Sequence, residues 1–171
     1  MENIKRIHLL SGTEIEELYA RPEFSEHEQN LYFSLNPEER VALERFRNTR
    51  IYFILQLGYF KAKQQFFNLS FDEVSHDVQY IVSTYYSDTD MIRLKSALSR
   101  KYRYRQQRVI LLLFGYRNWS PQYTAETESH LTYLLRYYPK GHNAFRQLLA
   151  YFEHQKLVLP SYRILQVILP T

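Results

Sequence analysis

Apolar side chains along this 171-residue chain recur mostly at the spacing of α-helices. The clearest case is a run in which successive apolar residues share one helix face: Val74, Val78, Ile81 and Val82. The alternation of apolar and polar residues that is typical of a half-buried strand is not convincing anywhere, although residues 157–159 could be extended. The pattern therefore predicts an all-α fold.

Residues that favour helix ends divide this pattern into segments. Capping boxes are expected at Thr13–Glu16 and at Ser70–Glu73. Asn36 followed by Pro37 is a stronger start, because proline fits the first position of a helix. Further helices are expected over 51–60, within 93–114 ending at Gly115, from Ser120–Pro121 to near Pro139, from Asn143, and from Pro160–Ser161.

A weak internal repeat suggests how these helices are grouped. Leu57–Phe60 and Leu149–Phe152 are 92 residues apart, and Phe53 and Phe145 precede them in the same register. A new helix start follows each copy, as in tandem helix-turn-helix modules. Chance recurrence of Tyr-Phe pairs is the alternative in a chain that is 16% aromatic. On the first interpretation we expect two small helix-turn-helix-like domains, 1–90 and 120–171, joined by a basic connecting helix within 91–119.

Composition narrows the class of protein. Cysteine is absent, which excludes disulfides and thiolate chemistry. The longest apolar run, 109–114, is far too short to span a membrane, and no apolar signal-peptide segment follows the first residues. We expect a soluble, cytoplasmic protein without membrane contacts.

Charge is distributed unevenly along the chain. The net charge is only +4, but residues 91–123 hold eight basic side chains and no acidic one. Residues 1–90 hold nine basic against fifteen acidic side chains. Such asymmetry is typical of proteins that bind a polyanion. A solvated basic surface helix and a membrane-surface helix are the alternatives.

Candidate DNA contacts fall in three places. In the basic stretch, Arg and Lys would neutralise phosphates, with interleaved Tyr102 and Tyr104 and neutral Gln106 and Gln107 beside them. In the last helix, Arg163 and Gln166 could read base edges if Ile164, Leu165 and Ile168 face inward; a plain packing helix is the alternative. In the first module, Asp72, Glu73 and Asp77 would repel phosphate, so the preceding helices supply the candidates. The candidates are Arg45, Arg47, Arg50, Lys61, Lys63, Arg93, Lys95, Arg100, Lys101, Arg103, Tyr104, Arg105, Arg108, Arg117, Ser161, Tyr162, Arg163 and Gln166.

Catalytic groups do not assemble in the sequence. The six histidines show no metal-ligand spacing, and His76–Asp77 is better explained as a surface pair. No phosphate-binding glycine loop or nucleophile elbow occurs. We expect no catalytic residue, metal or cofactor in this chain.

Several motifs, in this order, resemble the N-terminal region of Tn-three family replicative transposases: Leu9–Leu18, Tyr32–Arg40, Leu55–Phe60, Gly115–Trp119 and Val158–Leu165. The resemblance implies sequence-specific binding to double-stranded DNA at the transposon's terminal inverted repeats, in the bacterial nucleoid. It also implies that cutting and joining, with a divalent metal at an Asp-Asp-Glu triad, belong to a later domain outside these residues. The chain would then be a fragment or truncated copy that self-associates through the rest of the transposase. A helical protein-interaction or oligomerisation module and a stand-alone DNA-binding regulator are the rival interpretations.

Overall fold

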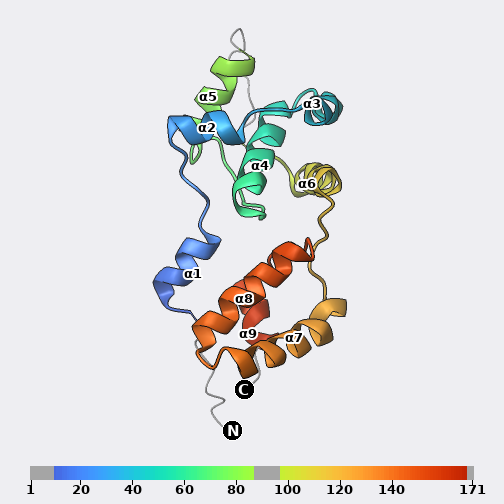
Figure 1. Ribbon diagram of the computed structural model, residues 1–171. Coiled ribbons are helices and arrows are strands. Elements are labelled where there is room, and N and C mark those ends of the chain that lie inside the picture. The colour runs from blue at the N-terminus through green and yellow to red at the C-terminus, as the bar shows by residue number, and fades with distance from the viewer. Residues whose placement is uncertain (1–9, 87–96, 169–171) are drawn as a thin grey trace. The chain divides into compact units, whose positions relative to one another are not determined.

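The regular secondary structure of the chain is helical (Figure 1), which confirms the predicted all-α class. The computed structural model describes residues 10–86 and 97–168. Contacts divide the chain into two compact units. The first, Arg21–Gly115, is called the α4 unit after its central helix. The second, called the α8 unit, combines the described residues of Met1–Ala20 with those of Tyr116–Thr171.

This division differs from the expected boundaries of 1–90, 91–119 and 120–171. Residues 10–20 pack with the C-terminal part of the chain, because Ile15 and Leu18 lie against its apolar cluster. The expected connecting helix is not a free linker either. Its residues Gln106, Ile110 and Leu111 are buried within the α4 unit.

One helix forms the centre of the α4 unit. Every residue of α4 from Ile51 to Phe60 is buried, so the helix has no solvent face, as expected for a helix that is apolar all round. Its polar groups have internal partners: Tyr52 donates to the Leu69 carbonyl and Tyr59 donates to the Asp77 carboxylate. The elements of the unit are α2 (Glu26–Tyr32), α3 (Pro37–Leu43), the 3-10 helix η1 (Glu44–Phe46), α4 (Arg50–Lys63), α5 (Ser75–Tyr85) and α6 (Arg100–Phe114).

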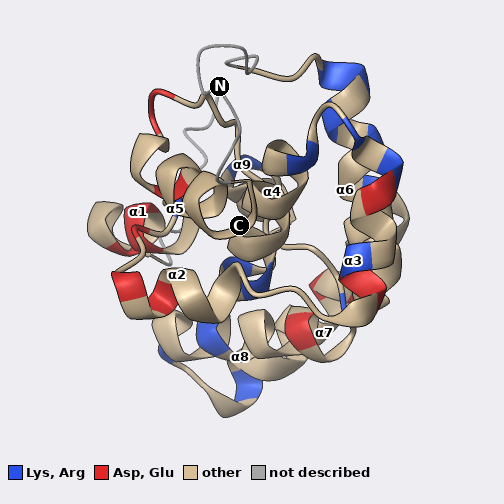
Figure 2. Ribbon diagram, turned by 90° about the horizontal axis from the view of Figure 1, so that it is seen from above, with Lys and Arg blue, Asp and Glu red and all other residues tan. Residues whose placement is uncertain are grey.

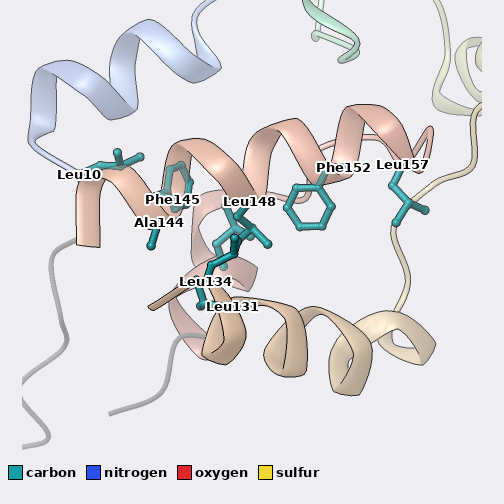
Figure 3. Close-up of a cluster of buried hydrophobic side chains, with 9 residues drawn as sticks. Leu10, Leu131, Leu134, Ala144, Phe145, Leu148, Phe152 and Leu157 are labelled. Carbon is teal, nitrogen blue, oxygen red and sulfur yellow. The ribbon is translucent and has the colours of Figure 1, made fainter. Parts of the chain in front are cut away.

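The core of the α8 unit lies between α7 and α8, two consecutive helices that pack against each other in antiparallel orientation (Figure 3). Leu131 and Leu134 of α7 meet Phe145, Leu148 and Phe152 of α8 in one buried cluster. The Tyr19 hydroxyl donates to the Pro160 carbonyl over 2.7 Å, which ties the end of the first helix to the start of the last. The elements are α1 (Gly12–Tyr19), the 3-10 helix η3 (Pro121–Tyr123), α7 (Thr124–Tyr137), α8 (Gly141–His154) and α9 (Tyr162–Ile168).

Two predicted helix boundaries, one start and one end, are confirmed. Asn36 caps α3 by accepting from the Glu39 amide, and Gly115 ends α6 in the left-handed region at φ 67°. Within α3, Leu43 is buried, but Val41 is 69% exposed.

Other predicted starts are wrong by a few residues. The capping box of α1 is formed by Ser11 and Glu14, because these two side chains, and not Thr13 and Glu16, bond each other's backbone amides. α5 begins at Ser75 after a turn, not at Ser70. Lys140 rather than Asn143 occupies the N-cap position of α8.

The two repeated segments occupy equivalent places on α4 and α8. Both helices have 14 residues, and Phe53 and Phe145 are both fully buried. Four residues after Phe60 and after Phe152 the backbone adopts the left-handed conformation, at Gln64 and Lys156, both with φ 52°. These features support the repeat. The helix-turn-helix assignment stays a prediction.

Candidate nucleic-acid interface

Helix α6 carries the densest group of exposed cations in the described residues (Figure 2). Arg100 and Lys101 lie in its first turn, next to the positive end of the helix dipole, and its first turn contains no acid. Cations at that end destabilise a helix, so helix stability does not explain their presence. An anionic partner would offset this repulsion. The exposed cations of α6 are Arg100, Lys101, Arg105 and Arg108.

Buried glutamines fix α6 against α4. Gln106 is 1% exposed; its Nε2 donates to the carbonyl and the hydroxyl of Thr49, over 3.1 and 2.9 Å. Its Oε1 accepts from Gln56 Nε2 over 2.8 Å, and Gln107 Nε2 donates to Gln56 Oε1 over 3.1 Å. The expectation that Gln106 faces DNA is therefore wrong. The network instead sets which face of α6 turns outward.

One cation of α6, Arg105, shares a groove with two predicted arginines from another part of the chain. The groove has a volume of about 630 Å³ and lies between the 44–49 segment and the start of α6. Arg45 and Arg47 line one side, and Tyr102 and Arg105 line the other. Glu44 also lines it, but its Oε2 lies 2.7 Å from Arg50 Nη2, which compensates the negative charge. The structure thus brings together candidates that are about 60 positions apart in the sequence.

Two further side chains of α6 interact with each other and with the protein. Arg103 is half-buried and donates to Asn68. Tyr104 accepts a hydrogen bond of 3.2 Å from Arg100 Nε, and Arg100 and Arg103 both lie near its ring. The hydrogen bond from Arg100 and its positive charge lower the pKa of Tyr104 below its usual value. Arg103 is consequently less available to a ligand than Arg105 or Arg108.

Not every predicted cation near α4 is available to a ligand. Lys61 Nζ lies 2.7 Å from Glu39 Oε2 and donates to the Ser34 carbonyl, also over 2.7 Å. Arg50 is paired with Glu44, and Lys63 is half-buried in the last turn of α4. Arg93 and Lys95 lie outside the described residues.

Of the three acidic residues after Ser70, Asp77 is withdrawn from the surface. Asp77 is 5% exposed and accepts from Gln29 Nε2 and from Tyr59. It therefore holds α2, α4 and α5 together. Asp72 and Glu73 are exposed, but they lie in the turn before α5.

The candidates of the α8 unit are only partly placed as expected. Arg163 is exposed and Gln166 half-exposed on α9, while the Ser161 hydroxyl accepts from the Ile164 amide. Leu165 and Ile168 face inward, as predicted, but Ile164 is 37% exposed. Tyr162 packs against the apolar cluster instead of facing out.

Arg117 lies just before η3. Its guanidinium is 5.4 Å from the centre of the Tyr123 ring, and its backbone pairs with the 156–158 segment. It is exposed, but it belongs to the α8 unit, so it is not part of the α6 surface.

Tyr102, which was expected beside the basic side chains, and Thr49, which was not named as a contact, also line the groove. Tyr102 is 55% exposed at the groove, three positions before Arg105 and therefore on the same side of α6. That spacing was readable in the sequence. The position of Thr49 depends on packing between α4 and α6 and left no comparable signal.

The described part of the chain contains neither a cluster of metal ligands nor a membrane-spanning helix. Within 10–86 and 97–168, no three His, Asp or Glu side chains gather closely enough to hold a metal ion. None of the helices in these ranges combines the length and apolar character that a membrane span requires.

Comparison with known proteins places the chain in a family. The chain belongs to the family described as "Domain of unknown function (DUF4158)", whose model matches residues 9–170. No curated protein and no solved structure matches it significantly. The family description assigns no activity, so a functional argument has to rest on the residues themselves.

Proposed function

We propose that this chain binds double-stranded DNA sequence-specifically at transposon terminal inverted repeats, as the N-terminal part of a replicative transposase. The observation that carries the DNA binding is the α6 surface. Four exposed cations lie on α6 without an acid, and one of them, Arg105, lines a groove together with Arg45 and Arg47. Lys and Arg side chains that contact phosphates release counterions, which is the main source of affinity for DNA.

The α9 helix supplies the candidate for base recognition. Arg163 is exposed there and Gln166 is half-exposed, three positions further along the same helix. Arginine can pair with guanine and glutamine with adenine through two hydrogen bonds each. The buried Leu165 and Ile168 hold the opposite side of α9 in the core. Phosphate contacts from the α4 unit and base contacts from the α8 unit are thus proposed independently of each other.

The proposal of a transposon end as the site rests on the order of the sequence motifs. The segments that resemble Tn-three family transposases begin at Leu9 and end at Leu165, and the family match covers 9–170. The resemblance and the family therefore describe the same region. No group for strand cutting is assigned to this chain, which under this proposal belongs to a separate catalytic domain.

An aromatic row on α7 favours a second candidate function, protein interaction. Tyr133 and Tyr137 are 52% and 66% exposed, and their rings lie 4.8 Å apart. The row continues through His130 to Tyr151, whose rings stack at 4.0 Å. Exposed tyrosines of this kind are enriched at protein interfaces. The α7 row is compatible with DNA binding by α6, because the two lie in different units.

Selection from random-sequence duplexes tests the proposed function. The chain is incubated with the pool, bound duplexes are amplified, and enriched sequences are compared with the terminal repeats of the element that encodes it. Enrichment of the terminal-repeat sequence is the expected result. Binding without any enrichment would contradict sequence recognition, and absence of binding at low salt would contradict the DNA function as a whole.

A further inference from the structure

The groove between η1 and α6 has the size of a small-molecule site. Its volume of about 630 Å³ lies within the range of about 300–1,000 Å³ that is typical of ligand pockets. The groove is therefore large enough for one small ligand, in addition to any contact that its exposed arginines make with a duplex backbone.

The arginines that line the groove suit a phosphate. Arg45, Arg47 and Arg105 line it and are exposed, and within 10–86 and 97–168 no hydrogen bond or ion pair occupies their guanidinium groups. The one acid in the lining, Glu44, is paired with Arg50. Arginine presents several donors in a planar fork that matches phosphate oxygens.

Two helix starts add to the positive potential of the groove. α4 begins after Thr49 and α6 begins after Ser99, and neither side chain caps its own helix. The Thr49 hydroxyl instead accepts from Gln106. Thr49 and Ser99 both line the groove, so two helix N-termini without a side-chain cap border it, and helix N-termini favour anions.

The groove also contains side chains that suit a planar ring. Tyr102 lines it and is 55% exposed, and Leu98, Ala97 and Phe46 provide apolar surface next to it. Bases stack on exposed tyrosine rings without regard to sequence. Phosphate-binding and ring-stacking groups therefore occur together in a space that fits one nucleotide.

We propose that the groove binds a single nucleoside monophosphate unit, with its phosphate at Arg45, Arg47 and Arg105 and its base against Tyr102. Two sources share this chemistry: an unpaired nucleotide at the end of a DNA strand, and a free nucleotide. The first source rests on the proposed DNA function and the second does not. Under the first, the α4 unit distinguishes a DNA end with an unpaired nucleotide from a fully paired duplex.

Fluorescence anisotropy with the full chain separates these sources. Three probes are used: a blunt duplex, the same duplex with a short 5′-phosphorylated unpaired extension, and free thymidine monophosphate as a competitor. We expect the extension to increase affinity about tenfold, the scale of one stacked base. Tyr102→Leu should remove this gain, and should therefore weaken binding of the extended duplex by more than it weakens binding of the blunt one.

Two arginine variants complete the experiment. Arg105→Gln lies in the groove and should reduce binding of the extended duplex more than that of the blunt one. Arg108→Gln is the matched control, because Arg108 is exposed on the same helix but does not line the groove. It should weaken both duplexes equally.

Equal affinity for blunt and extended duplexes, with no effect of Tyr102→Leu and no competition by thymidine monophosphate, would overturn the groove proposal. The proposed duplex binding would survive that result. If instead no duplex is bound, saturable binding of thymidine monophosphate that is lost in Tyr102→Leu would support the groove with a free nucleotide and would contradict the DNA function.

Discussion

The ring of Phe33 packs directly onto the backbone of Gly58. A Cβ atom added at Gly58 would lie 2.4 Å from two carbons of that ring. Phe33 is fully buried at the C-cap of α2, and Gly58 lies on the buried central helix α4. The glycine is therefore required for close approach of α2 to α4, not for a turn.

Gly58→Ala should destabilise the protein even though alanine is the better helix former. The added methyl group has to displace a fully buried ring, and overpacking of this kind typically costs about 1–3 kcal/mol. Ala150→Gly at the equivalent place on α8 is the control; Ala150 is exposed, so only a helix-propensity loss of about 1 kcal/mol is expected. Urea unfolding measures both, and an unchanged or increased stability in Gly58→Ala would refute the close packing.

Gln106→Leu should weaken the attachment of α6 to α4. In this variant Gln56 Nε2 loses its hydrogen-bond acceptor and the Thr49 carbonyl loses the hydrogen bond that Gln106 donates, and both contacts lie in the buried region between α4 and α6. Unsatisfied buried polar groups typically cost about 1–3 kcal/mol each. Amide hydrogen exchange should rise first in α6. If exchange in α6 is unchanged while the variant stays folded, the glutamine network does not fix this helix.

Tyr151 should titrate well above an ordinary tyrosine. Burial, and then the hydrogen bond of 2.6 Å to Glu126 Oε1, raise its pKa from 10.0 to about 12. Because the folded pKa is the higher one, the stabilisation is complete below pH 10 and is lost as the pH rises through about 12. Carbon-13 NMR of the tyrosine ring should show this, and Glu126→Gln should lower the pKa. A Tyr151 pKa near 10 in the unmodified chain would contradict the contact.

Arg163→Ala should relax the preference at one base position while affinity for unrelated duplexes stays nearly constant. A side chain that pairs with a base edge contributes about 1–3 kcal/mol of discrimination at that position alone. Selection from random-sequence duplexes, carried out in parallel with the unmodified chain, measures the preference position by position. An identical preference in both proteins would remove α9 from base recognition.

Much of the fold was predictable because capping and periodicity are local. Asn36 with Pro37, and Gly115, mark helix ends through contacts within a few residues, so the sequence predicted them correctly. α2 was missed although its signal is equally local: Ser25 accepts from the Glu28 amide and bonds its carboxylate. Ser11 with Glu14 and Thr13 with Glu16 are two alternative capping pairs, and the periodicity of apolar residues did not decide between them.

The candidate site was predictable in its charges but not in its shape. The acid-free stretch indicated α6, and Arg45 and Arg47 were identified from the same physical argument about phosphates. That they share a groove with Arg105 depends on the packing of α3 and α4 against α6, which links residues far apart in the sequence. Gln106 and Asp77 were misjudged for the same reason: a polar side chain is buried when a partner on another helix satisfies it, and the partners Gln56 and Tyr59 lie on α4.

The salt dependence of DNA binding tests the role of α6 most directly. Each phosphate contact contributes about 0.9 to the slope of log K against log salt concentration. The variant Arg105→Gln/Arg108→Gln should therefore lower that slope by about 2, while Arg136→Gln/Arg146→Gln, two exposed arginines of the α8 unit, should leave it unchanged. The same slope in the α6 variant and in the unmodified chain would show that α6 does not bind the DNA backbone.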